Sequence, residues 1–465
     1  MLFNSYWPQM EQIMKNILEA NANIVKILGK PHIAQNDVRL SRYCVQVPVA
    51  DGLLLFHTLT RELLLLAREE AGQPLESEAL KERWFVVPDS LDEKKCADTV
   101  RWVLRTTAKR PKHITSYTIM TTTDCNARCF YCYEMGRSRI PMTEETAHKT
   151  ARYIREHCGG ERVKLSWFGG EPLFNRNVID IICEDLRRDG IEYSSKMISN
   201  GYLFDEDAVQ KANTFWHLKM VQITLDGTEE VYNRSKAYIY RDGKSPYQVV
   251  LSGVGRLLDA GITVAVRLNL DLYNAENLLS LADELAERFH GKKGLFVYAH
   301  LLFDAEPSAA GSHAAEEWQP RYEALYRLNR KLMQYGLSRN QRIKKNLKLS
   351  HCMADSGNAV VITPGGDIGL CEHYSESEFI GHIDREGFDK AVQASWKETA
   401  PAIPECADCF FYPECLKLKK CAAGSSCFPE DRELTIRNVR QSMLHEYRLW
   451  QQNRQHEEDE ADPLC

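Results

Sequence analysis

The sequence predicts an α/β fold: a partial (β/α)6 TIM-type barrel, preceded by an N-terminal α+β module and followed by a cysteine-rich domain. Between residues 114 and 303, six apolar strand patterns alternate with helical patterns. Before residue 107 the apolar runs are joined by tight turns instead, and beyond residue 351 the chain becomes irregular and rich in cysteine. Regular alternation of strands and helices is typical of a parallel sheet that closes wholly or partly into a barrel.

The N-terminal module begins with residues 10–29, which carry apolar side chains at helical spacing and end at Gly29. We therefore expect a helix there. Residues 42–69 read as a strand, a turn at Asp51-Gly52, a second strand and a further turn at Leu59-Thr60. The remaining predicted elements are a helix at 76–83, a strand at 84–88 and a helix at 92–106.

The barrel is predicted from strands and helices that follow one another without a long break. The expected strands are 114–121, 163–170, 193–201, 218–227, 261–271 and 294–303, and the helices between them are 143–157, 175–189, 205–214, 246–260 and 275–289. Most of these strands end in polar residues or glycine, as in FGGEP, SNG, LDG and NLD. Because functional sites lie at the carboxyl ends of barrel strands, we expect a site at this edge.

The C-terminal part is expected to hold helices at 316–349 and 431–453, with the acidic tail EEDEADPLC disordered. The basic end of the first of these helices is interpreted as a solvated face. The predicted domains are the N-terminal module at 1–107, the barrel at 108–345, the cysteine-rich domain at 346–430, and the last helix and tail at 431–465.

Charge and cysteine content restrict the class of protein. A net charge of -6 over 465 residues gives no reason to expect a nucleic-acid or membrane partner. The first residues lack a basic-then-apolar signal layout, and apolar runs such as Leu63 to Ala67 are far shorter than a membrane span. We therefore expect a cytoplasmic protein. In that reducing compartment the 15 cysteines favour metal binding over disulfides.

The first cysteine cluster is TTTDCNARCFYCYEMGR, with Cys125, Cys129 and Cys132 just after the first barrel strand. Three thiolates can hold three irons of a [4Fe–4S] cluster and leave the fourth iron open to a small molecule. The alternative is zinc, but structural zinc takes four ligands and this loop offers no second CxxC or histidine pair. Cys44, Cys96, Cys158 and Cys183 are isolated and are interpreted as small buried apolar residues.

The CxxxCxYC spacing, with Tyr131 before the third cysteine, resembles the signature of the radical SAM enzymes. The resemblance covers about residues 110–305. It implies that the open iron binds the amino and carboxylate groups of S-adenosylmethionine (SAM). It also implies an external electron donor such as flavodoxin or ferredoxin, whose electron cleaves SAM to a 5′-deoxyadenosyl radical that takes a hydrogen atom from substrate.

Later strand ends resemble the SAM-binding segments of the same family. In WFGGEP, Gly169 and Gly170 allow close backbone approach, and Glu171 supplies a negative charge for the SAM ammonium. The resemblance gives Ser199 and Asn200 to the SAM ribose or carboxylate. It gives weaker support to Asp226, Arg267 and Asn269.

The second cysteine zone runs from Cys352 to Cys427. It resembles the SPASM domain, which carries two auxiliary [4Fe–4S] clusters. By this resemblance the first cluster is bound by Cys352, Cys371 and Cys421, and the second by Cys406, Cys409, Cys415 and Cys427. Five residues separate Cys415 from Cys421 where the family has three, so the division of ligands between the clusters stays open. Three ligands would leave the first cluster with an open iron. A zinc ribbon is the alternative, and Cys465 is interpreted as a bystander.

Members of the SPASM group act mostly on peptides or proteins. Glu372 follows Cys371 directly and is a candidate base that takes a proton from the substrate, or else a solvated glutamate. Residues 40–107 loosely resemble a leader-peptide-binding module, whose exposed strand would add the leader as a further strand. An ordinary packing extension of the barrel is the alternative.

The resemblance thus implies a radical SAM oxidoreductase that modifies a ribosomally made precursor peptide, with thioether cross-linking as the preferred reaction. Carbon–carbon cross-linking and epimerisation share this architecture. A formylglycine-forming sulfatase maturase is a further alternative, although Phe168 stands where such enzymes have glutamine. A protein that uses its clusters only for electron transfer would form no 5′-deoxyadenosine.

Overall fold

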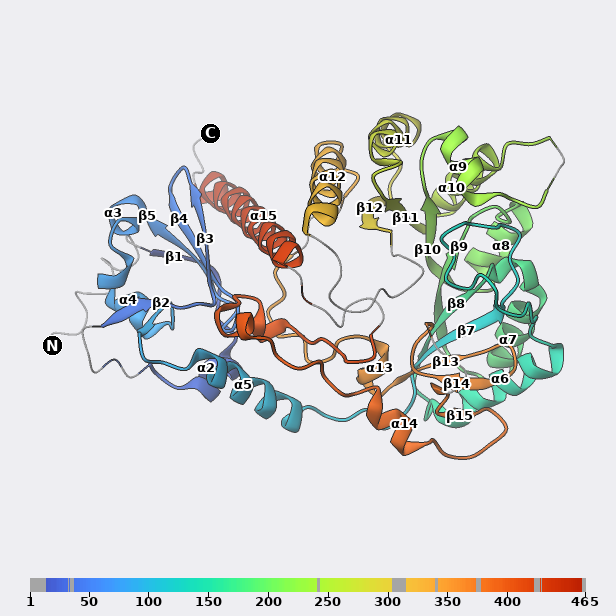
Figure 1. The fold of residues 1–465 in the computed structure, drawn as a ribbon, viewed down its shortest axis with the longest axis horizontal. Coiled ribbons are helices and arrows are strands. Elements are labelled where there is room, and N and C mark those ends of the chain that lie inside the picture. The colour runs from blue at the N-terminus through green and yellow to red at the C-terminus, as the bar shows by residue number, and fades with distance from the viewer. Residues whose placement is uncertain are drawn as a thin grey trace.

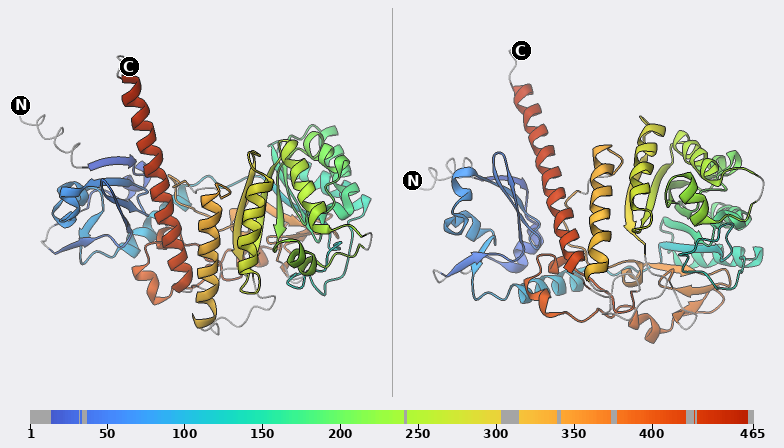
Figure 2. Two further views of the ribbon diagram at one scale, coloured as in Figure 1. Left: turned by 90° about the horizontal axis from the view of Figure 1, so that it is seen from above. Right: turned by 45° about the horizontal axis from the view of Figure 1, so that its top comes forward.

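The computed structural model describes residues 14–31, 33, 37–240, 243–302, 315–338, 342–373, 378–421, 427 and 429–461 (Figure 1). An N-terminal unit and a large parallel sheet lie at opposite ends of the molecule, and the long helix α15 (Pro429–Ala461) stands between them (Figures 1 and 2). In the described residues, no helix is both long enough and apolar enough to cross a bilayer.

The N-terminal unit is built on a four-stranded antiparallel sheet in the order β1-β5-β4-β3. Its strands are β1 (Met14–Leu18), β3 (Cys44–Val49), β4 (Gly52–His57) and β5 (Leu63–Ala67). The two predicted turns are confirmed, because they join β3 to β4 and β4 to β5. The predicted helix at 10–29 is wrong for residues 14–18, which pair with β5. Residues 10–13 of it lie outside the described residues, and its last part is helix α2 (Ala22–Leu28), capped by Asn21.

Both faces of this sheet are covered by apolar side chains. One face packs on Met443 and Tyr447 of α15, and the other packs on Leu80, Phe85 and Val86. The other elements of the unit are β2 (Val38–Leu40), paired with β6 (Val86–Pro88), α3 (Arg68–Ala71), the 3-10 turn η1 (Pro74–Glu76), α4 (Glu78–Glu82) and α5 (Glu93–Thr107). The predicted strand at 84–88 and the helices at 76–83 and 92–106 are thus confirmed within a few residues.

His57 is buried in this unit between Tyr43 and Phe85. Burial lowers its pKa from 6.5 to about 4, so the unfolded chain takes up a proton that the folded unit excludes. The contribution of His57 to the free energy of unfolding is therefore complete above about pH 6.5. It is lost as the pH drops toward 4, and about 2 kcal/mol is lost at about pH 5. We expect His57→Asn, which keeps an acceptor for the Thr60 amide, to lose this part of the pH dependence. Hydrogen exchange of the β3–β5 amides at two pH values measures it, and an unchanged pH dependence in the variant would contradict the assignment.

The large sheet contains nine strands in the order β12-β11-β10-β9-β8-β7-β13-β14-β15. Strands β7 (Ser116–Thr122), β8 (Val163–Gly169), β9 (Tyr193–Ser199), β10 (Leu218–Leu225), β11 (Thr263–Leu270) and β12 (Leu295–Leu301) run parallel to their neighbours. These are the six predicted strands, in chain order, and the sheet forms the expected partial barrel.

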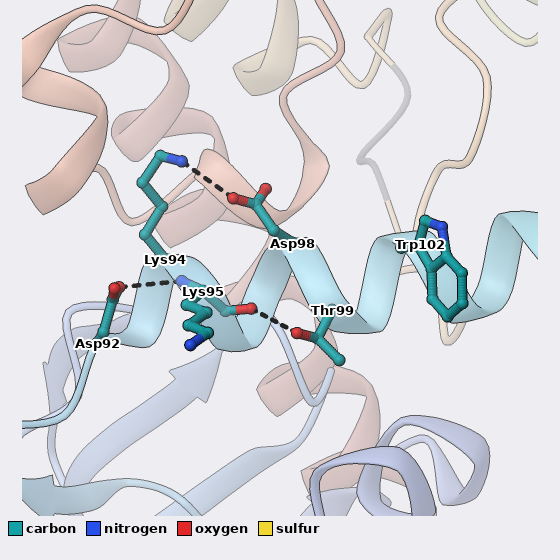
Figure 3. A pocket seen from close by; sticks show the side chains of 6 residues that line it. All are labelled: Asp92, Lys94, Lys95, Asp98, Thr99 and Trp102. Atoms are coloured by element: carbon teal, nitrogen blue, oxygen red, sulfur yellow. Dashed lines mark hydrogen bonds and ion pairs between the residues drawn. The ribbon is translucent and has the colours of Figure 1, made fainter.

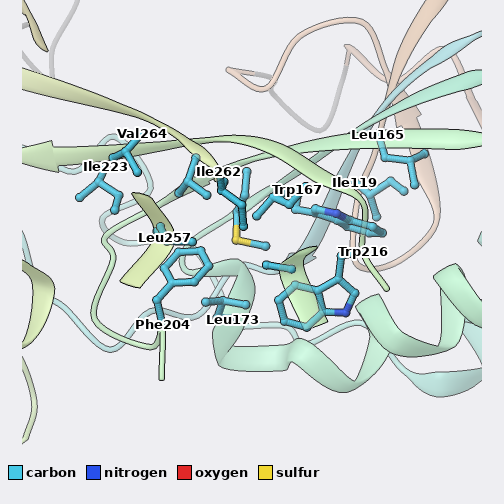
Figure 4. Packing of buried hydrophobic residues seen from close by; sticks show 14 of the residues in the cluster. Ile119, Leu165, Trp167, Leu173, Phe204, Trp216, Ile223, Leu257, Ile262 and Val264 are labelled. Carbon is cyan, nitrogen blue, oxygen red and sulfur yellow. The ribbon is translucent and has the colours of Figure 1, made fainter. Parts of the chain in front are cut away.

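Helices cover one face of this sheet. They are α6 (Glu144–His157), α7 (Arg176–Arg188), α8 (Glu206–Thr214), α9 (Glu229–Lys236), α10 (Pro246–Asp259), α11 (Ala275–Arg288) and α12 (Ala315–Gln334), with the 3-10 turn η2 (Pro172–Asn175). Figure 4 shows the buried layer, where Trp167 and Trp216 pack among Ile119, Leu165 and Leu173. This rigid apolar layer fixes the strand ends that carry the polar residues. The predicted helix at 316–349 is too long, because α12 ends at Gln334 and Gly336 follows with φ +67°.

The cysteine-rich region adds strands to the same sheet. Its elements are α13 (Met353–Ser356), β13 (Ala359–Ile362), β14 (Asp367–Gly369), β15 (Gly381–His382), α14 (Lys390–Ser395) and the 3-10 turns η4 (Pro404–Asp408) and η5 (Tyr412–Glu414). Strand β13 runs parallel to β7 and is therefore a seventh parallel strand. The acidic tail, residues 457–465, was predicted to be disordered, but α15 continues into it as far as Ala461. Residues 462–465 lie outside the described residues.

Candidate active site

The first cysteine cluster lies in the loop between β7 and α6, at the carboxyl edge of the sheet. Cys125, Cys129 and Cys132 are partly buried and form no disulfide. Two backbone hydrogen bonds hold the loop from the end of α9 and the segment after it: the Arg128 amide donates to the Lys236 carbonyl (2.8 Å) and the Ile239 amide donates to the Asn126 carbonyl (3.0 Å). The loop is thus fixed by a segment about 110 residues later in the chain.

The glycines of the GGEP segment pack directly on this loop. The Gly170 amide donates to the Thr122 carbonyl (2.9 Å) and the Glu171 amide donates to the Asp124 carbonyl (3.0 Å). A Cβ atom at Gly169 would lie 2.1 Å from the Thr122 oxygen, and one at Gly170 would lie 2.3 Å from the Asp124 oxygen. The glycines therefore allow two backbones to meet beside Cys125.

We expect Gly170→Ala to displace Asp124 and the adjoining Cys125, because the added carbon meets backbone atoms that cannot rotate away. Cluster content and the rate of 5′-deoxyadenosine formation should each fall about tenfold or more. The matched control is Gly255→Ala in α10, where the added carbon would meet only Phe289 at 3.9 Å. Equal iron content and rate in the two variants would contradict this role for Gly170.

Glu171 lies fully buried beneath the loop. Its carboxylate accepts hydrogen bonds from the Ser199 hydroxyl (2.9 and 3.1 Å), the Asn200 amide (2.8 Å) and the Leu173 amide (3.1 Å). Burial raises the pKa of Glu171 to about 7 in spite of these donors. The Asn200 side chain donates to Asn126 (2.6 Å) and to the Cys125 sulfur (3.6 Å). The structure thus joins Glu171, Ser199 and Asn200 to the cysteine loop, and their contacts with SAM stay predictions.

A buried charged network lies on the other side of the loop. The Tyr131 hydroxyl donates to Asp226 (2.6 Å), and the Lys236 ammonium contacts Tyr131 (2.6 Å), Thr224 (3.0 Å) and Asp226 (3.2 Å). Lys236 is only 2% exposed and Asp226 is fully buried. Burial raises the pKa of the Cys129 thiol, and the Lys236 charge opposes that rise. A buried cation therefore stands beside the expected cluster.

Sequence reasoning missed Lys236, because the segment YNRSK carries no motif and its helix was not predicted. Arg267 was predicted, and it reaches this network indirectly: its Nε donates to Asn269 (3.0 Å), whose amide donates to Asp226 (3.2 Å). The charge of Arg267 also acts on His373, which follows Cys371 by two residues. Arg267 is thus joined to the network at Asp226 through Asn269.

The second cysteine zone forms two separate groups. Burial, with Glu372, Cys352 and Cys421 nearby, raises the pKa of the Cys371 thiol to about 12. In the other group, burial raises the pKa of the Cys409 and Cys415 thiols, and both lie close enough to Cys406 and Cys427 for their charges to interact. The structure therefore brings together the two sets that the SPASM resemblance implied. The ligand roles themselves stay predictions.

The surroundings of these sulfurs fit thiolate ligands. The backbone amide two residues later in the chain donates a hydrogen bond to the sulfur of Cys125, Cys352 and Cys371, each at 3.4 Å. Similar contacts from backbone amides reach the sulfurs of Cys132 and Cys409. Isolated Cys158 does the reverse, because its thiol donates to the Arg155 carbonyl. Amide donors stabilise negative charge on sulfur and tune iron–sulfur clusters. In the described part of the chain no three His, Cys, Asp or Glu side chains converge on a single ion, and a cubane does not require this because each cysteine binds its own iron.

The comparisons with known proteins agree with this site. Residues 119–285 match the model of the radical SAM superfamily, and this range contains the cysteine loop and the GGEP segment. Residues 119–285 are a radical SAM domain. The chain is therefore an enzyme, and it uses a [4Fe–4S] cluster and SAM.

The individual proteins that the chain resembles are only distantly related to it. The chain is 27% identical over 271 residues to an uncharacterized protein, MJ0907, of Methanocaldococcus jannaschii, covering 57% of this chain and 86% of that protein. It is 30% identical over 176 residues to a probable GTP 3',8-cyclase of Archaeoglobus fulgidus, covering 37% of this chain and 54% of the cyclase. The chain thus spans about half the length of that cyclase. A structure of native anSMEcpe with bound AdoMet superposes with a TM-score of 0.56 over 72% of this chain and 99% of that one. At 14% identity this likeness shows the fold.

Lys236 is a buried cation beside the cysteine loop, and we predict that its charge attracts the carboxylate of SAM. We expect Lys236→Met to weaken SAM binding about tenfold or more, because the positive charge that contacts Tyr131 and Asp226 is lost. The single variant also leaves Asp226 buried without its cation, which can cost about 3–5 kcal/mol of stability. The double variant Lys236→Met/Asp226→Asn removes both charges. Equilibrium dialysis with SAM should show weak binding in both variants, and wild-type affinity in the double variant would exclude this role.

Proposed function

We propose that the chain is a radical SAM/SPASM maturase that abstracts hydrogen from a ribosomal precursor peptide, with thioether cross-linking as the preferred reaction. The observation that carries this proposal is the second cysteine zone, with its group of three sulfurs beside Glu372. Three protein ligands leave one iron of a cubane open. An open iron can bind a substrate thiolate while the carbon partner is activated at the SAM cluster.

The short distance between the loop that carries Cys132 and the segment after Cys371 supports this proposal. The ring of Tyr133, next to Cys132, contacts the ring of His373 at 4.2 Å between centroids. Burial raises the pKa of the Tyr133 hydroxyl, and Glu372 is among the charges that add to the rise. Glu372 therefore lies near enough to Tyr133, Cys352 and Cys371 for its charge to act on their pKa values. A base at this place would be within reach of a substrate held between the two clusters.

A peptide substrate also agrees with a solved structure of the same fold. Native anSMEcpe has been solved with bound AdoMet and the Cp18Cys peptide, and it superposes on this chain with a TM-score of 0.53 at 15% identity. That peptide belongs to anSMEcpe. For this chain we propose only the substrate class, a peptide, with flavodoxin or ferredoxin as the electron donor.

The N-terminal unit offers a place for a leader peptide. Within the described residues β3 pairs only with β4, so the outer edge of β3 has no strand partner. An extended peptide can add to such an edge through its backbone. We therefore propose that residues 1–107 bind the leader at β3 and that residues 346–430 hold the auxiliary clusters.

Other peptide chemistries use the same parts. Carbon–carbon cross-linking and epimerisation need the SAM cluster and a bound peptide but no thiolate on an auxiliary iron. Formylglycine formation is the second candidate, because the fold matches anSMEcpe. Phe168, which stands in the glutamine position and is 9% exposed in the sheet, favours the other readings.

The experiment is anaerobic co-expression with a short peptide encoded nearby, followed by intact mass with and without thiol alkylation. Loss of two hydrogens per site together with loss of an alkylatable cysteine indicates a thioether. Loss of two hydrogens with the cysteines still alkylatable indicates another cross-link or formylglycine made from serine. Formylglycine made from cysteine instead exchanges the thiol sulfur for an aldehyde oxygen and removes an alkylatable cysteine. Unchanged mass in water with deuterium uptake in heavy water indicates epimerisation and overturns the preferred reaction.

A further inference from the structure

The loop segment 406–415, which carries Cys406, Cys409 and Cys415, lies against the N-terminal unit. Each contact joins a residue before 107 to the backbone or a side chain of this loop. The contacts are Arg42 to the Ala407 carbonyl (3.3 Å) and to Asp408 (3.0 Å), Thr58 to the Phe410 carbonyl, Arg61 to Glu414 (2.9 Å), Arg101 to the Tyr412 carbonyl (3.4 Å), and the Tyr412 hydroxyl to Asp98 (2.7 Å).

The Arg61–Glu414 pair is the most buried of these contacts. Arg61 is 5% exposed and occupies the left-handed region at φ +68° in the turn between β4 and β5. Its guanidinium also donates to the Lys344 carbonyl (2.9 Å) and to the Thr58 carbonyl (3.2 Å). Breaking a buried ion pair by removing one partner leaves an uncompensated charge. The turn therefore has a fixed shape and holds Glu414, the neighbour of Cys415, in place.

Helix α5 holds the middle of the loop. Figure 3 shows Lys94 and Asp98 on one side of α5, joined as an ion pair (2.9 Å), at the rim of a shallow depression of about 330 Å³ that Trp102 also lines. Asp98 accepts from the Tyr412 hydroxyl, and the Lys94 ammonium lies 5.0 Å from the centre of the Tyr412 ring. Tyr412 lies between Cys409 and Cys415, so α5 contacts the loop between these two cysteines.

We propose that the N-terminal unit is a structural part of the site that holds the second auxiliary cluster. Arg61, Asp98 and Thr58 are positioning residues that hold loop 406–415 so that Cys406, Cys409 and Cys415 face one cluster. This rests on the proposed cluster at these cysteines and goes beyond it, because it gives residues 1–107 a role in cofactor binding that is separate from any leader peptide.

The physical reason is the conformational entropy of a loop with little regular structure. Within 406–415 the backbone forms only parts of the short 3-10 turns η4 and η5. Ordering such residues costs conformational entropy for each residue whose backbone is fixed. Contacts that order the loop before iron binds lower the cost of placing three thiolates around one cluster. Without them, the loop has to be ordered by iron–sulfur bonds alone.

The test is site-resolved thiol alkylation of the full, iron-loaded chain under anaerobic conditions, with peptide mapping by mass spectrometry. A cysteine bound to iron is protected, so the labelling rate reports each cluster separately. We expect Arg61→Gln and Asp98→Ala to label Cys406, Cys409 and Cys415 about tenfold faster than wild type, with Cys125, Cys129 and Cys132 unchanged. Asp98 lies on the helix surface with its side chain 45% exposed, so its variant keeps the fold if Arg61→Gln does not.

The matched control is Lys81→Gln, which breaks another ion pair of the same unit, Lys81–Glu78 (2.7 Å), on helix α4. In this variant the ten cysteines that are predicted to bind iron should be alkylated at wild-type rates. If Cys406, Cys409 and Cys415 are protected from alkylation in wild type and stay equally protected in both Arg61→Gln and Asp98→Ala, this inference is overturned. Rapid labelling of Cys406, Cys409 and Cys415 in the wild-type chain would instead overturn the proposed second cluster.

Discussion

A variant in which Cys125, Cys129 and Cys132 are all alanine is expected to form no 5′-deoxyadenosine from SAM. These are the only three cysteines on the loop between β7 and α6. Burial raises the pKa of the Cys125 thiol to about 12, so a thiolate at this place needs iron to balance its charge. Without the three ligands neither the cluster nor the SAM site can form. The iron content should fall by one [4Fe–4S] cluster, while the iron of the proposed auxiliary clusters near Cys371 and Cys409 remains.

Anaerobic incubation with SAM and dithionite, followed by chromatography of the nucleosides, measures this expectation. Cys158→Ala is the control, because Cys158 is buried in the barrel and donates to the Arg155 carbonyl. It should lose some stability but keep its full iron content and cleavage. Continued 5′-deoxyadenosine formation by the triple variant would mean that the SAM cluster is bound elsewhere.

Glu372→Gln is expected to separate SAM cleavage from product formation. Glutamine keeps the size of the side chain but cannot accept a proton, so a reaction that needs a base at this place stops after hydrogen abstraction. The 5′-deoxyadenosine should still form, while modified peptide falls about a hundredfold or more. Glu398→Gln, a surface glutamate paired with Lys419, should behave as wild type. Normal yields of modified peptide from Glu372→Gln would leave Glu372 as a solvated surface residue.

The barrel could be predicted from sequence because its periodicity is local. Each strand from β7 to β12 is a run of apolar residues followed by a turn and an amphipathic helix, so every element carries its own pattern. The cysteine loop and the GGEP segment could be predicted for the same reason, since their chemistry depends on spacing within a few residues. Their meeting at one edge follows from the parallel order of β7 and β8.

Features that depend on distant partners could not be predicted. Residues 14–18 were assigned to a helix because their apolar spacing fits a helix as well as a strand, and pairing with β5 decides for the strand. Lys236 belongs to the site only because its segment returns to the cysteine loop. The contacts of loop 406–415 with Arg61 and Asp98 join residues more than 300 positions apart, and no local pattern encodes them.

Strand β13 has a consequence for how such an enzyme can be divided or recombined. Its four residues close the β7 side of the parallel sheet, although they lie beyond the predicted end of the barrel at residue 345. A gene cut at that boundary would leave β7 with a row of unpaired backbone groups, and exposed edges of this kind associate with other chains. The barrel and its cysteine-rich extension therefore share one sheet, and a swap between relatives should keep both sides of that seam together.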